Sequence, residues 1–156
     1  MKNILLPLAL LLSLLACKNT DCGEQPVAVP AQVVFGVSHA ECLGDCSRNY
    51  KLTPEQLFAD DCDFCTLDNI TFQKIPLGSV KFDLAKSLLE SVTDVVLNTP
   101  DTVFGCPGCH DEGAYYLEIT SNNEKHVFRW SSDFVDIPEE LHPYFEQVRQ
   151  VLQDLQ

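Results

Sequence analysis

Basic residues are scarce in this chain of 156 residues, and their scarcity limits the partners that it can bind. The chain has 10 Lys and Arg residues against 23 Asp and Glu residues, which gives a formal net charge of −13 at pH 7. The few basic residues form no cluster, whereas nucleic acids and anionic lipid surfaces are bound by basic patches. We therefore expect no nucleic-acid partner, and the acidic surface favours solubility or contact with cations and basic partners.

Long apolar runs are also lacking, apart from one short run near the start. Residues 4–15 are apolar, interrupted by Pro7 and Ser13, and follow Lys2, but a transmembrane helix needs ~18 or more such residues. A run of this length after a basic start and before small residues is typical of a secretory signal peptide. We therefore expect residues 1–16 to be a cleaved signal peptide.

The end of this leader, Leu14-Leu15-Ala16-Cys17, resembles the lipobox of bacterial lipoproteins. The resemblance implies that Cys17 becomes the first mature residue, that it is diacylated, and that its amine is usually acylated, with palmitate as an expected chain. Such chains hold a protein in a membrane because each buried methylene contributes about 0.8 kcal/mol. Lys18 is not the acidic residue that favours inner-membrane retention in enteric bacteria, so we expect the outer membrane of the cell envelope. In the alternative, the signal peptide is an ordinary one and Cys17 is a disulfide partner.

The rest of the chain is long enough for one folded domain. Lys2 is the only charged residue of the leader, so its removal changes the net charge from −13 to −14. Residues 17–31 lack periodicity and contain Pro26 and Pro30, which indicates a lipidated N-terminus with a flexible tether. Because 46% of the chain is hydrophobic, residues 32–156 can bury the core of a single domain.

The first half of this domain carries strand patterns. Residues 32–38 are β-branched and apolar, which predicts a first strand. Tyr50 and Leu52 alternate with polar neighbours, and a second short apolar patch at 57–58 predicts a broken strand or a hairpin. Apolar residues within 70–75, before Pro76, predict a further strand.

The second half alternates helical and hairpin patterns. Apolar residues at spacings of three and four predict a helix from Val80 to the region 91–94. Residues 115–120 and 125–130 flank a polar turn and predict an antiparallel hairpin. An opening turn near 138–141 then leads into a closing helix from Pro143. The order predicts an α+β fold in which two helices pack on one face of an antiparallel sheet and leave the other face to water.

Cysteine is the residue type that offers the most chemistry here. Eight cysteines occur; Cys17 is assigned to the anchor, and Cys22 lies in the tether, where it can be free, acylated or paired with another molecule. In an exported protein we expect disulfides among the other six, which form three close pairs: Cys42, Cys46, Cys62, Cys65, Cys106 and Cys109. Residues three or four apart can reach the Cα separation of about 4.4–6.8 Å that a disulfide needs, but the connectivity stays open.

Two of these pairs also match metal-site patterns. Cys62-Asp-Phe-Cys65 and Cys106-Pro-Gly-Cys109 have the spacing of the two halves of a four-thiolate zinc site, with His110 as an alternative ligand. Cys106 to His110 also matches the C-x-x-C-H pattern for covalent haem c attachment, in which His110 would bind the iron. An oxidising compartment disfavours zinc thiolates. Residues 17–156 contain no Met, so a sixth iron ligand would have to be another histidine: His39, His126 or His142.

Catalytic patterns are weaker still. A C-x-x-C pair can cycle between dithiol and disulfide when a cation or a helix N-terminus lowers one thiol pKa, but Asp111 and Glu112 follow Cys109 and disfavour a thiolate. No nucleophile elbow, phosphate-binding loop or metalloprotease helix occurs. We therefore expect a non-enzymatic protein, with a zinc or thiol-redox protein as the alternative.

Several segments resemble a group of small uncharacterised bacterial lipoproteins: Glu41-Cys-Leu-Gly-Asp-Cys46, Gly105-Cys-Pro-Gly-Cys109 with the following 113–119, and the closing 137–141. The likeness covers most of residues 32–155 and rests on an E-C-x-G-x-C turn after the first strand and a C-P-x-C turn before the hairpin. It implies no particular activity. The chain departs from the group at Cys62 and Cys65, which favours a metal site, and at His110, which weakens the haem hypothesis. We expect a lipid-anchored envelope domain that is stabilised by disulfides and binds a protein or glycan partner.

Overall fold

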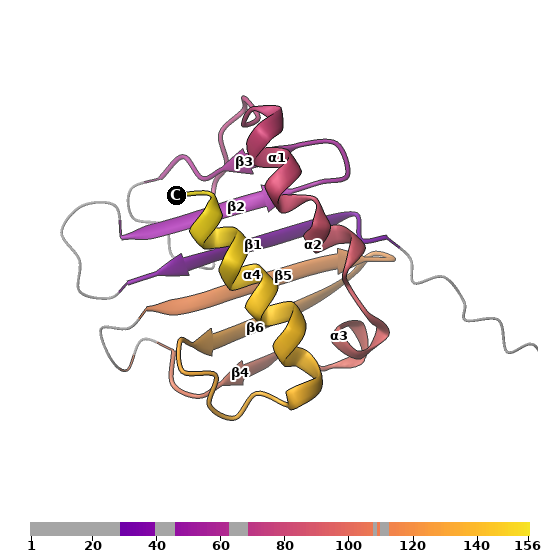
Figure 1. Ribbon diagram of the computed structural model, residues 1–156, viewed down its shortest axis with the longest axis vertical. Helices are drawn as coiled ribbons and strands as arrows, with labels where there is room; N and C mark the ends of the chain where they lie inside the picture. The colour runs from indigo at the N-terminus through magenta and orange to yellow at the C-terminus, as the bar shows by residue number, and fades with distance from the viewer. Residues whose placement is uncertain (1–28, 40–45, 63–68, 108, 110–112) are drawn as a thin grey trace, which may run out of the picture.

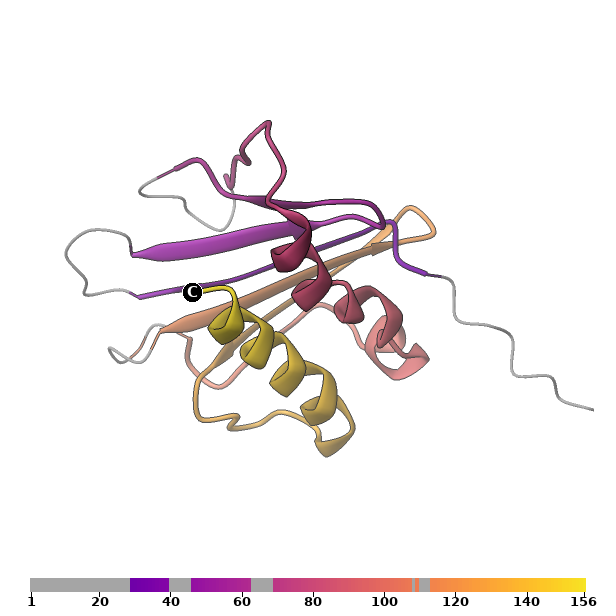
Figure 2. The ribbon, with the colours of Figure 1, turned by 45° about the horizontal axis from the view of Figure 1, so that its top comes forward.

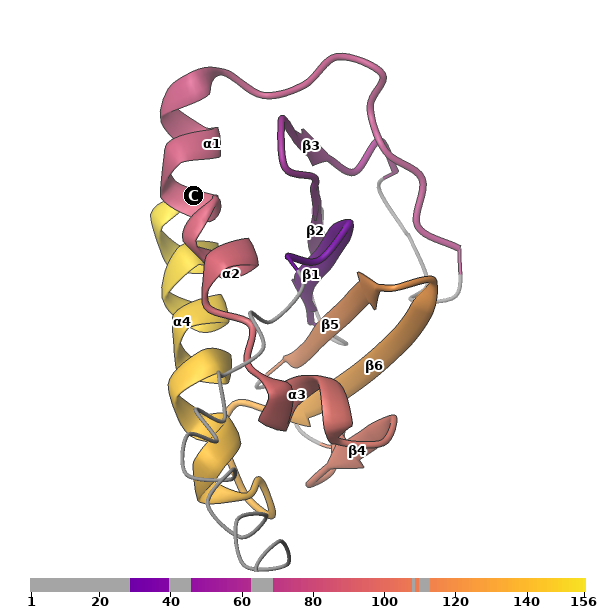
Figure 3. The ribbon, with the colours of Figure 1, turned by 90° about the vertical axis from the view of Figure 1, so that its right-hand side faces the viewer.

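The computed structural model describes residues 29–39, 46–62, 69–107, 109 and 113–156. These residues form a six-stranded sheet with helices packed on one face, as Figures 1 and 3 show. The α+β fold class is therefore confirmed. The leader and most of the tether lie outside the described residues. None of the helices in the described ranges is long and apolar enough to cross a membrane.

The strands lie in the order β3-β2-β1-β5-β6-β4 across the sheet. Their bounds are β1 (Gln32–Ser38), β2 (Ser47–Leu52), β3 (Leu57–Ala59), β4 (Thr102–Phe104), β5 (Ala114–Ser121) and β6 (Glu124–Ser131). All neighbouring pairs are antiparallel except β4 and β6, which are parallel. The first strand has the predicted bounds, and the predicted hairpin of residues 50–58 is the β2–β3 pair.

β1 occupies the middle of the sheet because its apolar residues are buried on both faces. Val33 and Phe35 are fully buried in the core beneath the helices, and Val34 on the opposite face is only 5% exposed. A short continuous apolar run is typical of such a buried strand. The expectation that the second face is left to water is wrong at Val34, because Ile70 and Phe72 cover that part of the face and line one pocket with it.

The β5–β6 hairpin matches the prediction for residues 115–130. Its two turn residues, Asn122 and Asn123, have φ angles of 52° and 66°. Asparagine tolerates this left-handed conformation, and a two-residue turn of this kind follows the twist of the two strands. The turn sets the register in which Tyr115 faces Trp130.

Three short helices follow β3: α1 (Ser79–Ala85), α2 (Ser87–Glu90) and α3 (Asp94–Asn98). α1 and α2 occupy the stretch that was expected to form one helix, and Lys86 separates them. α3 is an addition to the predicted elements. It begins where the Thr93 hydroxyl accepts the Val96 N–H at 3.4 Å, a typical N-cap contact.

The chain closes with a 3₁₀ turn, Glu139–Leu141, and α4 (His142–Asp154), as the pattern predicted. α4 lies beside α1 and α2 on the same sheet face (Figures 2 and 3). The Tyr144 hydroxyl donates to the Leu88 carbonyl at 3.0 Å, and burial raises the pKa of Tyr144 well above its ordinary value. This hydroxyl therefore stays neutral and joins α4 to α2. The Phe145 ring stacks on Trp130 at 4.5 Å and joins α4 to the sheet.

Two segments differ from the prediction. The predicted strand at residues 70–75 does not form: Phe72 makes only an isolated bridge with Asp60. Ile70 and Phe72 instead lie over the open face, the sheet surface opposite the helices that carries Val34, Glu118 and Val127, whereas Ile75 is 78% exposed. β4 was not predicted, because it has three residues and its partner β6 lies beyond β5 in the chain.

Candidate functional site

The cysteine-bearing turns meet at one end of the sheet. The strand register places the end of β1, the start of β2, the end of β3, the end of β4 and the start of β5 at the same end. Cys46, Cys62 and Cys106 are next to these strand ends, and we call this region the cysteine end. His39 contacts Gly113 there: a Cβ on Gly113 would lie 2.9 Å from the His39 ring. Sequence spacing alone did not predict this convergence.

Disulfides account for the described cysteines at this end. Cys106 and Cys109 are bonded to each other, with their Cα atoms 5.4 Å apart, and the Cys109 N–H donates to the Cys106 carbonyl at 3.1 Å. This local pairing is one of those that the sequence left open. Cys46 and Cys62 also take part in disulfides. Because a disulfide sulfur is not a thiolate, the zinc and haem hypotheses concern only the reduced chain.

The predicted metal ligands are only partly described. Cys62, Cys106 and Cys109 have the positions given above, whereas Cys42, Cys65 and His110 lie outside the described residues, as do Cys17 and Cys22. Within the described ranges, no group of three or more His, Cys, Asp and Glu side chains is placed to hold a metal ion. Zinc and haem therefore stay predictions.

A cavity of about 740 Å³ opens beside the cysteine end. It is lined by Arg48, Tyr50, Ala59, Asp60, Asp61, Cys62, Gln73, Leu155 and Gln156. Its polar groups already stabilise the β3 edge. Asp60 Oδ2 accepts the Asn49 backbone N–H at 2.9 Å and the Asn49 side-chain amide at 2.7 Å, and the Gln73 amide donates to the Asp60 carbonyl at 3.1 Å. Asp61 accepts a hydrogen bond from the Thr71 hydroxyl. These contacts give the acidic groups of the cavity a structural role.

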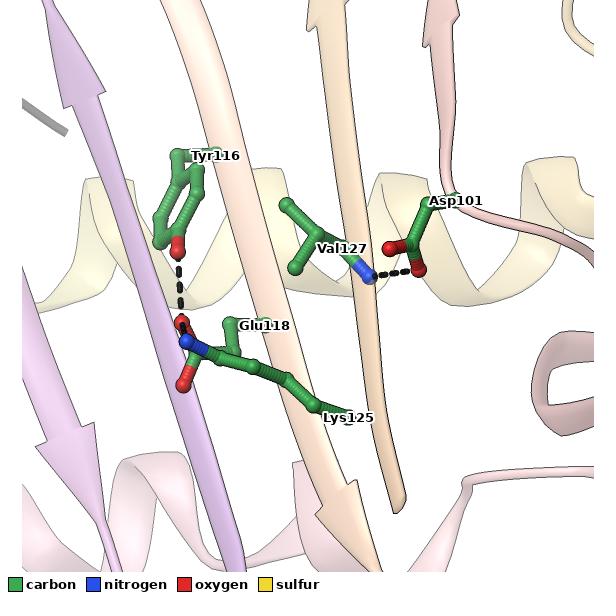
Figure 4. Close-up of polar contacts among 5 residues, drawn as sticks. All are labelled: Asp101, Tyr116, Glu118, Lys125 and Val127. Carbon is green, nitrogen blue, oxygen red and sulfur yellow. Dashed lines mark hydrogen bonds and ion pairs between the residues drawn. The ribbon is translucent and has the colours of Figure 1, made fainter. Parts of the chain in front are cut away.

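A second cavity, of about 380 Å³, lies on the open face and is called the open-face pocket. Its floor comes from β1, β5 and β6, and Ile70 and Phe72 form one wall. The lining residues are Gln32, Val34, Ile70, Phe72, Tyr116, Glu118, Lys125, Val127 and Arg129. Figure 4 shows part of this face with the helices behind the sheet. Ligand pockets commonly combine apolar walls with a few polar groups in this way.

The wall of the pocket is attached to the sheet. The Gln73 N–H donates to the Ala59 carbonyl at 2.9 Å, next to the bridge at Phe72. The Lys51 ammonium lies 4.7 Å from the centre of the Phe58 ring and 5.0 Å from that of the Phe72 ring. Cation–π contacts of this kind hold the Phe72 ring over β2 and β3.

Glu118 is the central polar residue of the pocket. The Tyr116 hydroxyl donates to its Oε2 at 2.6 Å, and the Lys125 ammonium lies 2.8 Å from the same oxygen (Figure 4). The Glu118 side chain is 13% exposed and that of Lys125 is 59% exposed, so the ion pair stands at the boundary with solvent. Both contacts use Oε2. No described residue donates to Oε1, and this oxygen is not buried.

Two further contacts involve residues of the pocket lining. The Arg129 guanidinium lies 6.0 Å from the centre of the Tyr116 ring and covers the end of the pocket away from Lys125. The Asp101 carboxylate accepts the Val127 N–H at 2.8 Å (Figure 4). The β4–β6 pairing begins one residue later, where Thr102 pairs with Phe128. Asp101 therefore provides an acceptor for the N–H of Val127, the β6 residue just before the paired segment.

No sequence motif marks these pocket residues. Tyr116, Glu118, Lys125 and Arg129 look like ordinary polar positions of a hairpin, whereas the cysteines form recognisable patterns. A usable signal was present in the alternation of the two strands, which places all four side chains on one face. The Glu118–Lys125 pair then follows as a diagonal cross-strand contact.

No protein-family model matches the chain, and a search of curated proteins finds no match. The resemblance to small bacterial lipoproteins therefore stays a prediction. The fold and the open-face pocket are the observations on which a function can be argued.

Proposed function

We propose that this chain is a lipid-anchored lipoprotein of the bacterial cell envelope, in the outer membrane, and that its folded domain is a non-enzymatic binding module. The lipobox-like sequence ending at Cys17 supports the anchor. The observation that carries the binding function is the open-face pocket, in which Val34 and Val127 lie beside a Glu118–Lys125 pair that still has hydrogen-bonding capacity. Its volume of about 380 Å³ suits one small ligand or one unit of a larger partner.

The chemistry of the lining favours binding over catalysis. The lining contains no Ser, Thr, Cys or His, the residues that most often act as nucleophile or as general acid–base catalyst. Its one carboxylate is already paired with Lys125 and accepts the Tyr116 hydroxyl. Such a group can orient a ligand through hydrogen bonds.

The anchor predicts a clear result for Cys17→Ser. This variant should lose lipid labelling, because no thiol remains for lipid transfer, and it should either leave the membrane fraction or keep its leader unprocessed. Labelled palmitate incorporation and membrane fractionation of cells making the full chain measure the effect. Cys22→Ser is the matched control, and it should keep a palmitate label and be retained in the membrane because Cys17 is still present. Equal palmitate labelling and membrane retention of Cys17→Ser would show that the anchor assignment is wrong.

The pocket predicts that Val127→Trp blocks binding. An indole at this floor position fills the space between Val34 and the Ile70 wall, whereas the same change at Val80, which is 75% exposed on α1, leaves the pocket unchanged. Full-length lipidated protein in detergent should co-sediment with cell-wall sacculi of the producing bacterium. Val127→Trp should weaken this binding at least about 10-fold, the effect of losing ~1.4 kcal/mol. Val80→Trp should bind as the wild type does. The binding function would be contradicted if the wild-type protein did not co-sediment with sacculi, or if Val127→Trp bound them as well as the wild type does.

A further inference from the structure

We propose that the ligand of the open-face pocket is a neutral glycan and that Gln32, Glu118 and Lys125 recognise its hydroxyl groups. This inference rests on the proposed binding function and names the chemical class of the ligand. It is carried by three polar groups that keep hydrogen-bonding capacity around one patch of sheet. Val34 and Val127 on the floor, with the wall of Ile70 and Phe72, offer apolar contacts to the C–H surfaces of a sugar ring.

The sheet register brings the three groups together. Gln32 in β1 and Lys125 in β6 both pair with Thr120 of β5, from opposite sides. Neighbouring strands lie about 4.8 Å apart, so the backbones of Gln32 and Lys125 are about 10 Å apart across β5. Glu118 stands two residues from Thr120 on the same face, and the Lys125 side chain reaches toward it over β5 (Figure 4).

The donors and acceptors of these groups match those of hydroxyls. Glu118 Oε1 can only accept, and the Lys125 ammonium has N–H donors beyond the one directed at Glu118. The Gln32 carboxamide can do both, and no described residue hydrogen-bonds to it. A hydroxyl both donates and accepts, so adjacent hydroxyls can satisfy the carboxylate and the ammonium together. An anion would face Glu118, and a cation would face Lys125.

Net charge points to the same class. Residues 17–156 carry a formal charge of −14, which repels acidic polysaccharides over distances longer than one contact. Inside the pocket the Glu118–Lys125 pair is neutral as a unit, and the remaining charge of the lining is the Arg129 guanidinium, which lies over the Tyr116 ring. A neutral ligand therefore loses no charge–charge energy on entering.

The position of the pocket disfavours a peptide as its ligand. Extended peptides are held mainly by main-chain hydrogen bonds to an unpaired strand edge. The floor of the pocket is β1, β5 and β6, and β1 and β5 are paired with strands on both sides. The backbone N–H and C=O groups of these strands form the hydrogen bonds of the sheet. Side chains are therefore the groups that remain to bind a ligand.

The test uses full-length lipidated protein in detergent and four probes. These are two neutral oligosaccharides, chitotetraose and maltotetraose, an acidic one, tetragalacturonate, and a neutral tetrapeptide, each titrated by calorimetry. At least one neutral oligosaccharide should bind, and Val127→Trp should abolish its binding. Glu118→Gln keeps the side-chain shape and should weaken binding about 10- to 100-fold, the usual effect of losing a charge-assisted hydrogen bond. Glu90→Gln, an exposed change on α2, is the matched control and should have no effect.

The outcomes separate this inference from the proposed function. If the tetrapeptide or the acidic oligosaccharide binds better than both neutral ones, or if neither neutral one binds at millimolar concentration, the glycan inference is wrong. The binding function then still stands, provided that the interaction with sacculi remains sensitive to Val127→Trp. Neutral oligosaccharide binding that Glu118→Gln leaves unchanged would also contradict the inference, provided that this variant unfolds at the wild-type temperature.

Discussion

Trp130→Ala should lower the free energy of unfolding by about 3–5 kcal/mol, the usual cost of truncating a buried tryptophan. Trp130 is fully buried, and its ring lies between Tyr115 at 5.4 Å and Phe145 at 4.5 Å. It therefore joins β5, β6 and α4 in one aromatic stack. Denaturant unfolding of the oxidised protein, followed by far-UV circular dichroism, measures the loss.

Trp130→Phe is the matched control for this experiment. The indole nitrogen of Trp130 is buried and has no hydrogen-bond partner among the described residues, so phenylalanine removes no such bond. An aromatic ring also remains between Tyr115 and Phe145. We expect a loss of roughly half that of the alanine variant, because phenylalanine removes fewer buried atoms and leaves a smaller cavity. Equal losses for the alanine and phenylalanine variants would show that the aromatic stack is not the source of the stability.

Gly36→Ala should destabilise the protein by about 2–4 kcal/mol. A Cβ at this position would overlap the Asn49 side-chain oxygen and lie 2.6 Å from the Arg48 carbonyl, which is backbone of the neighbouring strand. Overpacking of this kind costs about 1–3 kcal/mol. Displacing Asn49 also weakens its hydrogen bond to Asp60, which adds about 1 kcal/mol.

Gly78→Ala provides the comparison for Gly36→Ala. No atom lies within 4 Å of a Cβ built at Gly78, which precedes α1. The added methyl group restricts the unfolded chain, but Gly78 is also the N-cap of α1, where Ala is less favourable than Gly, so stability should change by no more than about 1 kcal/mol in either direction. Thermal melts of the two variants under identical conditions give the difference. If both variants melt at the same temperature, close packing of β1 against β2 is not the reason why glycine occupies position 36.

The elements that the sequence predicted well are those specified by local patterns. The turn at Asn122 and Asn123 fixes the β5–β6 hairpin within a few residues, and the apolar stripe of α4 repeats over three turns. The apolar residues of this closing segment are buried: Leu141, Tyr144, Val148, Val151, Leu152 and Leu155. Local signals of this kind need no knowledge of the rest of the fold.

Elements that depend on distant partners were missed or misassigned. β4 has three residues and exists only because β6 pairs with it in parallel. The apolar residues at 70–75 have the composition of a strand, but Phe72 packs near Lys51 and Phe58 instead of joining a continuous ladder. The sequence shows that these residues are apolar, but it does not show which surface they pack on.

The candidate site shows the same limit more strongly. Gln32 and Glu118 lie far apart in the chain and approach each other only because β1 pairs with β5. No motif marks that pairing. The cysteine motifs did stand out, and the structure places Cys46, Cys62 and Cys106 together at one end of the sheet, where they form disulfides.

The central position of β1 also determines how the domain bears mechanical load. Residues 29–31 lead directly into β1, which has six residue pairs with β2 and seven with β5. The hydrogen bonds of both ladders are perpendicular to the strand, so tension along β1 shears them together instead of opening them one after another. Force that enters the domain from its N-terminal side is thus shared between the two ladders in the middle of the sheet.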